Sequence, residues 1–179
     1  MKKPILLISI IAFAVAACQQ TPEPEPVDIN AEKDAILKVI QNESEYALDG
    51  KFEKFKDLYI HDDLNTRLNF RLDSFEIIKG WDNILERMKY LEEREEIGNS
   101  ITIKKENPII KVTGNTAWLI CDNIWQGVYE GEDIYSNNLQ ITFLEKVDGE
   151  WKISFAAWLQ KPETEEEEGE DEEEVAEED

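Results

Sequence analysis

The spacing of apolar residues changes once along the chain, near Gly98. Before that glycine, apolar side chains recur every three or four residues, which is typical of helices that bury one face. After it they alternate with polar side chains, which is typical of strands that bury one face. A run of helices followed by a run of strands predicts an α+β fold, in which three amino-terminal helices pack on one face of a curved antiparallel sheet.

Turn and breaker residues divide this pattern into elements. Gly50 ends the first predicted helix and Gly98 ends the third. The three helices are predicted at residues 31–48, 51–60 and 81–97, with a short strand at 66–70. Four strands are predicted at residues 101–112, 116–129, 134–146 and 151–160. Asp148-Gly149 is a typical two-residue hairpin turn, and Pro108 is expected at a bulge or at the edge of the sheet.

The amino-terminal residues have the composition of an export signal. A basic start (residues 1–3) precedes an apolar run of 14 residues (4–17), shorter than the ~20 that a helix needs to cross a bilayer. The run ends in Val15-Ala16-Ala17-Cys18, which resembles the lipobox of bacterial lipoproteins. The resemblance implies that residues 1–17 are a signal peptide and that acyl chains on Cys18 hold the protein on a lipid bilayer. A conventional signal peptide that happens to precede a cysteine is the alternative.

The residues after Cys18 indicate a spacer. Gln19 follows the cysteine, which favours the outer membrane by the sorting rule of lipoproteins in two-membrane bacteria. Residues 18–30 include Pro22-Glu23-Pro24-Glu25-Pro26, a stiff sequence that cannot pack a core. We therefore expect a domain held away from a membrane of the bacterial cell envelope, facing the periplasm or the cell surface.

Charge is distributed unevenly along the chain. It has 41 acidic and 19 basic residues, with a formal net charge of −22. Residues 162–179 hold 13 of the acids and no Lys or Arg, which is typical of a disordered tail. Residues 31–161 are long enough for one domain with its own core. Nucleic acid is excluded as a partner, because its binding depends on cations that neutralise phosphates.

Five short segments carry a resemblance to a known family. They are Ala47-Leu48-Asp49-Gly50, Leu58-Tyr59-Ile60-His61-Asp62-Asp63, Lys79-Gly80-Trp81-Asp82-Asn83-Ile84, Gly114-Asn115-Thr116-Ala117-Trp118 and Asp148-Gly149-Glu150-Trp151-Lys152-Ile153. In this order they resemble the nuclear-transport-factor-2-like superfamily, in particular its SnoaL-like and ketosteroid-isomerase-like members. The resemblance implies a cone-shaped α+β barrel over residues 31–161, a pocket between helices and sheet, and a homodimer through the outer sheet face.

Polar residues at apolar positions are candidates for such a pocket. Glu43 lies on the apolar stripe of the first helix, and Asp122 shares a strand face with Trp118, Ile120 and Ile124. A buried carboxylate needs a partner or a raised pKa. By its resemblance to ketosteroid-isomerase chemistry, Asp122 would be the general base, and His61 or Tyr46 would donate to the oxyanion. The expected walls of the pocket are Trp81, Trp118 and Trp125.

Each candidate also has a structural interpretation. His61 can cap a helix carboxyl terminus. Asp122 can lie on the solvent or dimer face of its strand, because Ala117, Leu119 and Cys121 on the opposite face are also apolar. Glu43 can be a satisfied buried acid or point outward, and the tryptophans can belong to the core. The last strand is predicted to contribute a wall without chemistry, because one face consists of Trp151, Ile153, Phe155, Ala157 and Leu159.

Other kinds of site lack the necessary residues. One histidine and one cysteine besides Cys18 cannot supply the usual zinc ligands, and no glycine-rich loop suits a nucleotide phosphate. We therefore expect neither a metal nor a cofactor, and we expect Cys121 to be a small buried hydrophobe. Three functions stay open: binding of a small apolar or amphipathic ligand (or an accessory role), protein interaction or dimerisation, and isomerase-like catalysis by a pocket carboxylate.

Overall fold

The computed structural model of the chain describes residues 27–91, 100–129 and 131–162. Its helices are α1 (Ile29–Leu48), α2 (Phe52–Lys56), α3 (Trp81–Met88) and the 3-10 turn η1 (Lys89–Leu91). Its strands are β1 (Thr66–Phe70), β2 (Phe75–Lys79), β3 (Ile101–Thr113), β4 (Thr116–Tyr129), β5 (Glu132–Val147) and β6 (Glu150–Gln160). The predicted signal peptide, Cys18, most of the spacer, the end of the third helix and the acidic tail from residue 163 lie outside these ranges.

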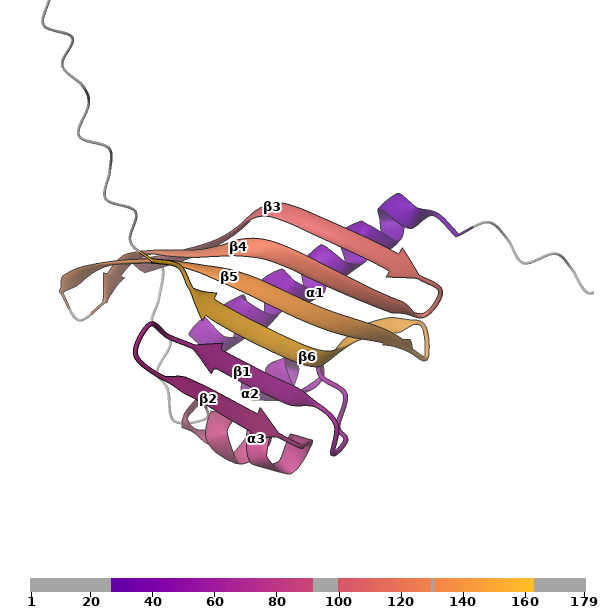
Figure 1. Ribbon diagram of the computed structural model, residues 1–179, viewed down its shortest axis with the longest axis horizontal. Helices are drawn as coiled ribbons and strands as arrows, with labels where there is room; N and C mark the ends of the chain where they lie inside the picture. Colours follow the sequence, from indigo (N-terminus) through magenta and orange to yellow (C-terminus); the bar gives the residue numbers. More distant parts are fainter. Residues whose placement is uncertain (1–26, 92–99, 130, 163–179) are drawn as a thin grey trace, which may run out of the picture.

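The structure confirms the α+β class, with helices packed on a curved sheet (Figure 1). Strands β3 to β6 form the predicted antiparallel meander, in the sheet order β2-β1-β6-β5-β4-β3. The sheet is mixed, because β1 pairs with β6 in parallel. It is open, because β2 and β3 stand at opposite ends of the strand order. Strand β2, which the sequence analysis did not predict, continues the sheet beyond β1.

Two irregularities interrupt the ladders. The register of β3 on β4 shifts between Glu106 and Ile109, and β3 is an edge strand, so both predictions for Pro108 are confirmed. The register of β5 on β6 shifts between Phe143 and Leu144. Phe143 pairs with Phe155 and Leu144 with Ile153, which leaves Ser154 as an extra residue.

This extra residue corrects the predicted apolar face of the last strand. Side chains alternate between the two faces of a strand, so one inserted residue reverses every later position. Trp151 and Ile153 face the core as predicted, but beyond Ser154 it is Ala156 that is fully buried. Trp158 and Gln160 follow Ala156 on the inner face, where both line the cavity described below.

Local chemistry explains the helices. Asp28 caps α1, because its side chain accepts hydrogen bonds from the backbone N–H groups of Asn30 and Ala31 at 3.0 and 3.2 Å. Helix α2 is shorter than predicted, since the chain after it pairs with β6 instead. Ile60 donates its N–H to the carbonyl of Ile153 at 2.9 Å, and Ile153 donates in return to Leu58 at 2.8 Å.

The helices cover the inner face of the sheet and bury the core there (Figure 1). Fully buried apolar side chains come from helices and strands alike: Ile36, Ile40, Ile84, Leu119, Leu144 and Ile153. Among the described residues, no helix combines the length and the apolar character that crossing a membrane requires.

Candidate ligand-binding cavity

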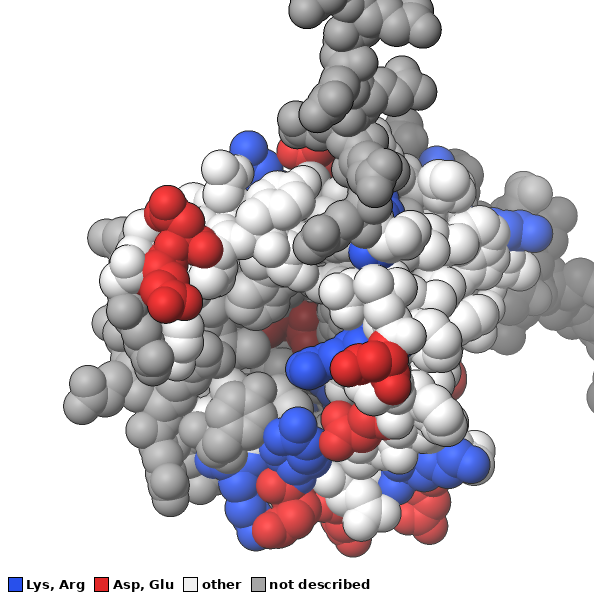
Figure 2. Space-filling model, turned by 60° about the vertical axis from the view of Figure 1, so that its left-hand side comes forward, with Lys and Arg blue, Asp and Glu red and all other residues white. Residues whose placement is uncertain are grey.

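A cavity with a volume of ≈ 500 Å³ lies where the last turns of α1 meet β1 and the inner faces of β4, β5 and β6. Figure 2 shows the molecule hollowed on the side to which β1 and β6 extend, with acidic and basic side chains together inside the hollow. The lining side chains are mostly polar or aromatic: Glu43, Ser44, Ala47, Arg67, Asn69, Phe70, Arg71, Met88, Asn123, Trp125, Ser136, Asn138, Trp158 and Gln160.

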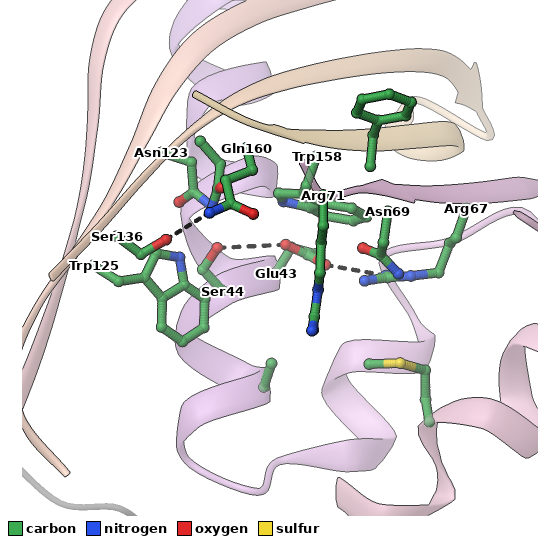
Figure 3. Close-up of a pocket in the computed structure, with 14 residues that line it drawn as sticks. Glu43, Ser44, Arg67, Asn69, Arg71, Asn123, Trp125, Ser136, Trp158 and Gln160 are labelled. Atoms are coloured by element: carbon green, nitrogen blue, oxygen red, sulfur yellow. Dashed lines mark hydrogen bonds and ion pairs between the residues drawn. The ribbon is translucent and has the colours of Figure 1, made fainter. Parts of the chain in front are cut away.

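Glu43 lies at the floor of this cavity with both carboxylate oxygens occupied (Figure 3). It is 4% exposed and continues the buried stripe of α1. Its Oε1 accepts hydrogen bonds from Tyr59 at 2.8 Å and from Arg67 at 3.2 Å, and its Oε2 accepts one from Ser44 at 3.4 Å. Glu43 is therefore a buried acid with hydrogen-bond partners, as one of its structural interpretations predicted, and it does not point outward. Burial raises the pKa of the Tyr59 phenol well above its usual value, so Tyr59 is a permanent donor.

Arg67 is the charge partner of Glu43, and the sequence analysis did not identify it. Its guanidinium lies over the ring of Trp158, 4.3 Å from the centroid, and also donates to the Tyr59 oxygen. Arg67 and Asn69 on one face of β1, and Arg71 directly after the strand, all line the cavity. Polar residues at every second position of this segment were the sequence signal that could have predicted this wall of the cavity.

Lys105 lies behind the cavity wall and joins three elements. Its Nζ donates to the side-chain oxygens of Ser44, Asn123 and Gln140, each at 2.7 Å. These three acceptors match the three donors of an ammonium group. Burial lowers the pKa of Lys105, and the negative charge of Glu43 opposes that effect. Through Ser44, the Lys105 cluster is continuous with the Glu43–Arg67 pair.

Of the predicted site residues, Glu43 and Trp125 line this cavity. His61 instead places its Nε2 2.9 Å from the carbonyl of Lys56, the last residue of α2, in keeping with the capping interpretation. Its ring stacks on that of Trp81 with 4.0 Å between centroids, and Trp81 belongs to the core. Tyr46 lines a different, more open depression of ≈ 760 Å³ near the start of α1.

Asp122 and Trp118 lie on the outer face of β4, away from the cavity. Ala117, Leu119 and Cys121, which alternate with the residues of that face, are buried against the helices. Asp122 forms an ion pair with Lys161 at 2.5 Å and accepts a hydrogen bond from Asn107 at 2.8 Å. The structure thus corrects the hypothesis that Asp122 is a pocket base, because the alternation of β4 turns the opposite face inward.

Asp122→Asn is expected to lower the free energy of unfolding by about 1 kcal/mol or less at neutral pH, because this ion pair is partly exposed. The hydrogen bonds from Lys161 and Asn107 hold the pKa of Asp122 below its usual 3.8. A depressed pKa in the folded state gives stability that is present above the unfolded-state value and is lost as the pH falls through the folded-state value. Denaturation of both proteins from pH 7 to pH 2 should show the difference vanishing in acid.

The described residues around the cavity add neither a reactive thiol nor a metal site. Burial raises the pKa of the Cys121 thiol to about 11, so it is not a nucleophile at neutral pH. Among the residues that the structure describes, no cluster of His, Cys, Asp and Glu could hold a metal ion. The chemistry of this region is that of hydrogen bonding, ion pairing and aromatic contact.

No protein-family model and no curated protein matches the chain, but many solved structures share its fold. It is similar to an NTF2-like protein of unknown function from Shewanella oneidensis, with 14% identity, 72% of this chain and 99% of that chain covered, and a TM-score of 0.56. It is similar to the association domain of CaMKII from C. elegans, with 17% identity, coverages of 73% and 97%, and a TM-score of 0.60.

A third similar structure is an NTF2-like protein with a cystatin-like fold from Novosphingobium aromaticivorans. Its identity is 14%, the coverages are 76% of this chain and 86% of that chain, and the TM-score is 0.60. At such identities the likeness concerns the fold alone. The helices packed on an open, curved sheet and the similarity to the two NTF2-like proteins agree that this chain has the nuclear-transport-factor-2-like fold.

Proposed function

We propose that the protein is a lipid-anchored protein of the bacterial cell envelope whose domain binds a small ligand in the cavity beside Glu43. The volume of ≈ 500 Å³ is typical of small-molecule sites, which range over roughly 300–1,000 Å³. Its polar lining suits an amphipathic ligand better than a wholly apolar one. The lipobox-like residues that end in Cys18 support the anchor.

The buried charges at the cavity floor are the observation that carries this proposal. The side chains of Arg67 and Glu43 are only 9% and 5% exposed, and burying an ion pair costs several kcal/mol of desolvation that apolar residues would avoid. A pair that is retained at that cost, hydrogen-bonded on both sides and bordering an open volume, is better explained by binding than by stability alone.

Catalysis has weaker support. Glu43 is the only carboxylate among the described lining residues, and both of its oxygens accept hydrogen bonds. A substrate would compete with these donors for the carboxylate before Glu43 could take its proton. Asp122, the other candidate base, lies on the opposite face of the sheet.

Ser136→Trp tests the cavity, because it places a large ring in the empty volume. Tyr135→Trp is the matched control, since Tyr135 precedes Ser136 on β5, is 67% exposed and faces outward. A diverse set of neutral, cationic and anionic small molecules is screened by thermal denaturation. A compound at 100 times its Kd stabilises by about 2.7 kcal/mol. Stabilisation of the unaltered chain and the control, but not of Ser136→Trp, is expected; no stabilisation of the unaltered chain, or equal stabilisation of all three, contradicts the proposal.

The anchor is tested by incorporation of radiolabelled palmitate in cells. Label in the unaltered chain and none in Cys18→Ser is expected, because the thiol is the acceptor. Label that persists in Cys18→Ser would place any acyl chain elsewhere and remove the lipobox interpretation.

Self-association through the outer sheet face is a second candidate function. One row of paired positions crosses all six strands with only apolar residues: Ile77, Leu68, Ala157, Ile141, Ile120 and Ile109. Several members and neighbours of this outer row are well exposed, including Phe75 at 68%, Ile109 at 60% and Phe143 at 48%. Apolar patches of this kind mark interaction sites. The similarity to the CaMKII association domain favours an assembly role.

Phe143→Lys is expected to convert a dimer to a monomer, because it places a charge among the exposed apolar side chains of the outer sheet face, two residues from Ile141 of the apolar row. Light scattering after size exclusion measures the mass directly. Leu64→Lys is the control, since Leu64 is 84% exposed and lies outside the sheet. A monomeric unaltered chain at all concentrations would rule out this assembly.

A further inference from the structure

The two arginines that line the cavity, Arg67 on β1 and Arg71 directly after it, differ in their partners. Arg67 is neutralised by Glu43 at 3.2 Å. Arg71 is exposed at the mouth, and its guanidinium forms no hydrogen bond or ion pair with any residue that the structure describes. The nearby Glu76 has its pKa lowered chiefly by a hydrogen bond from Arg87, with the charge of Arg71 as the last contribution. Among the described residues, no carboxylate therefore pairs directly with Arg71, whereas Glu43 pairs with Arg67.

Figure 3 shows the Arg71 side chain extending among the other lining residues, in front of Glu43 in this view. The same arginine also borders a second depression of ≈ 490 Å³ between β1, β2 and α3. Arg71, which is exposed, thus borders both depressions. A fork of N–H donors in this position suits the two oxygens of a carboxylate.

Asn123 adds donors to the opposite wall. Its side-chain oxygen accepts from Lys105 at 2.7 Å. Because an ammonium group only donates, this contact fixes the orientation of the amide and leaves its NH₂ group for other partners. Asn123 is 1% exposed and lines the cavity, and its NH₂ group has no acceptor among the described residues. An oxygen of a ligand in the cavity could therefore accept from this group.

Two indole rings complete the donor-rich lining. The N–H groups of Trp125 and Trp158 have no acceptor within the described part of the chain, and both rings border the cavity. An indole N–H can only donate, while its ring offers an apolar surface. Among the described lining residues a cationic ligand would find no free carboxylate, because Glu43 is already paired with Arg67.

We propose that the ligand of this cavity is a small organic carboxylate, whose oxygens are recognised by Arg71 and by amide and indole N–H donors, and whose apolar body lies against Trp125 and Trp158. This inference rests on the proposed ligand-binding function and names its chemical class. The anion is selected by the charge of Arg71 at the mouth, by the indole N–H groups and by the Asn123 amide, whose direction Lys105 fixes.

The test compares aliphatic and aromatic monocarboxylates with their primary amides, which have nearly the same shape but no charge. Binding to the full chain is followed by tryptophan fluorescence and by calorimetry. At least one carboxylate is expected to bind about tenfold or more tightly than its amide, because hydrogen bonds to a charged group are the stronger ones. Arg71→Gln should abolish this preference.

Arg87→Gln is the matched control. Arg87 is also an exposed arginine, but it lies on α3, pairs with Glu76 at 3.0 Å and borders only the second depression. This variant should keep the carboxylate preference within about twofold. An equal loss in Arg87→Gln and Arg71→Gln would overturn the proposal, because binding would then follow overall charge.

The two proposals fail in different ways. Neutral compounds that bind the unaltered chain and not Ser136→Trp, with no preference for any carboxylate, would leave ligand binding in place and overturn the carboxylate class. Absence of binding by every compound would overturn both proposals.

Discussion

Arg67→Met is expected to lower the free energy of unfolding by about 3–5 kcal/mol, because it leaves the Glu43 carboxylate buried without its counter-charge. The Glu43 side chain is 5% exposed and cannot reach bulk water without moving α1. Tyr59 and Ser44 would still donate to it, but neither carries a positive charge. Urea denaturation at pH 7, followed by circular dichroism, measures the loss.

Two further variants test whether the buried charge of Glu43 causes this loss of stability. Adding Glu43→Gln to Arg67→Met should restore most of the stability, because the uncompensated charge is then absent. Arg87→Met breaks an ion pair of similar length between side chains that are 54% and 42% exposed, and should cost about 1 kcal/mol or less. If Arg67→Met were as mild as Arg87→Met, the Glu43–Arg67 pair would not be the buried element described here.

Lys105→Met is expected to have the second large effect. It removes the donor shared by Ser44, Asn123 and Gln140, and each buried oxygen left without a partner costs about 1–3 kcal/mol. Asn123 would also be free to turn its amide, so carboxylate affinity should fall together with stability. Lys104→Met is the control: Lys104 is exposed on the other face of β3 and should change stability by about 0.5 kcal/mol or less.

The pH dependence of this loss has a defined sign. Burial places the folded-state pKa of Lys105 below its usual value of 10.5. Between the folded-state pKa and 10.5 the unfolded chain binds the proton more strongly than the folded chain, so this group's contribution to stability rises with pH. The stability difference between the unaltered chain and Lys105→Met should therefore grow toward pH 10. A difference that shrinks over that range would contradict a buried, desolvated lysine.

The sequence was sufficient for those parts of the fold that local patterns determine. The turns at Gly114 and at Asp148-Gly149 bound the predicted hairpins, and both glycines have positive φ angles, as does Asp148. Local patterns did not predict strand β2 or the position of β1 in the sheet. That position depends on a parallel contact between β1 and β6, which are distant in the sequence. The bulge at Ser154 has no local signal, so Trp158 and Gln160 could not be assigned to the inner face.

The candidate site was predicted only in part, for a related reason. Both faces of β4 carry apolar residues, and alternation alone does not say which face turns inward. Leu119 and Cys121 turned out to face the helices, which moved Asp122 to the outside and Asn123 to the cavity wall. Arg67 and Lys105 were missed because their partners on α1 lie 24 and 61 residues away in the chain.

The position of Glu43 near the far end of α1 has a consequence for changes at the amino end of the domain. Residue 28 joins the proposed tether to the first turn of this helix, and at 1.5 Å per residue Glu43 lies about 20 Å further along its axis. The cavity floor and the amino end of the domain are therefore separated by most of the length of α1, so a change near residue 28 would not alter the lining directly.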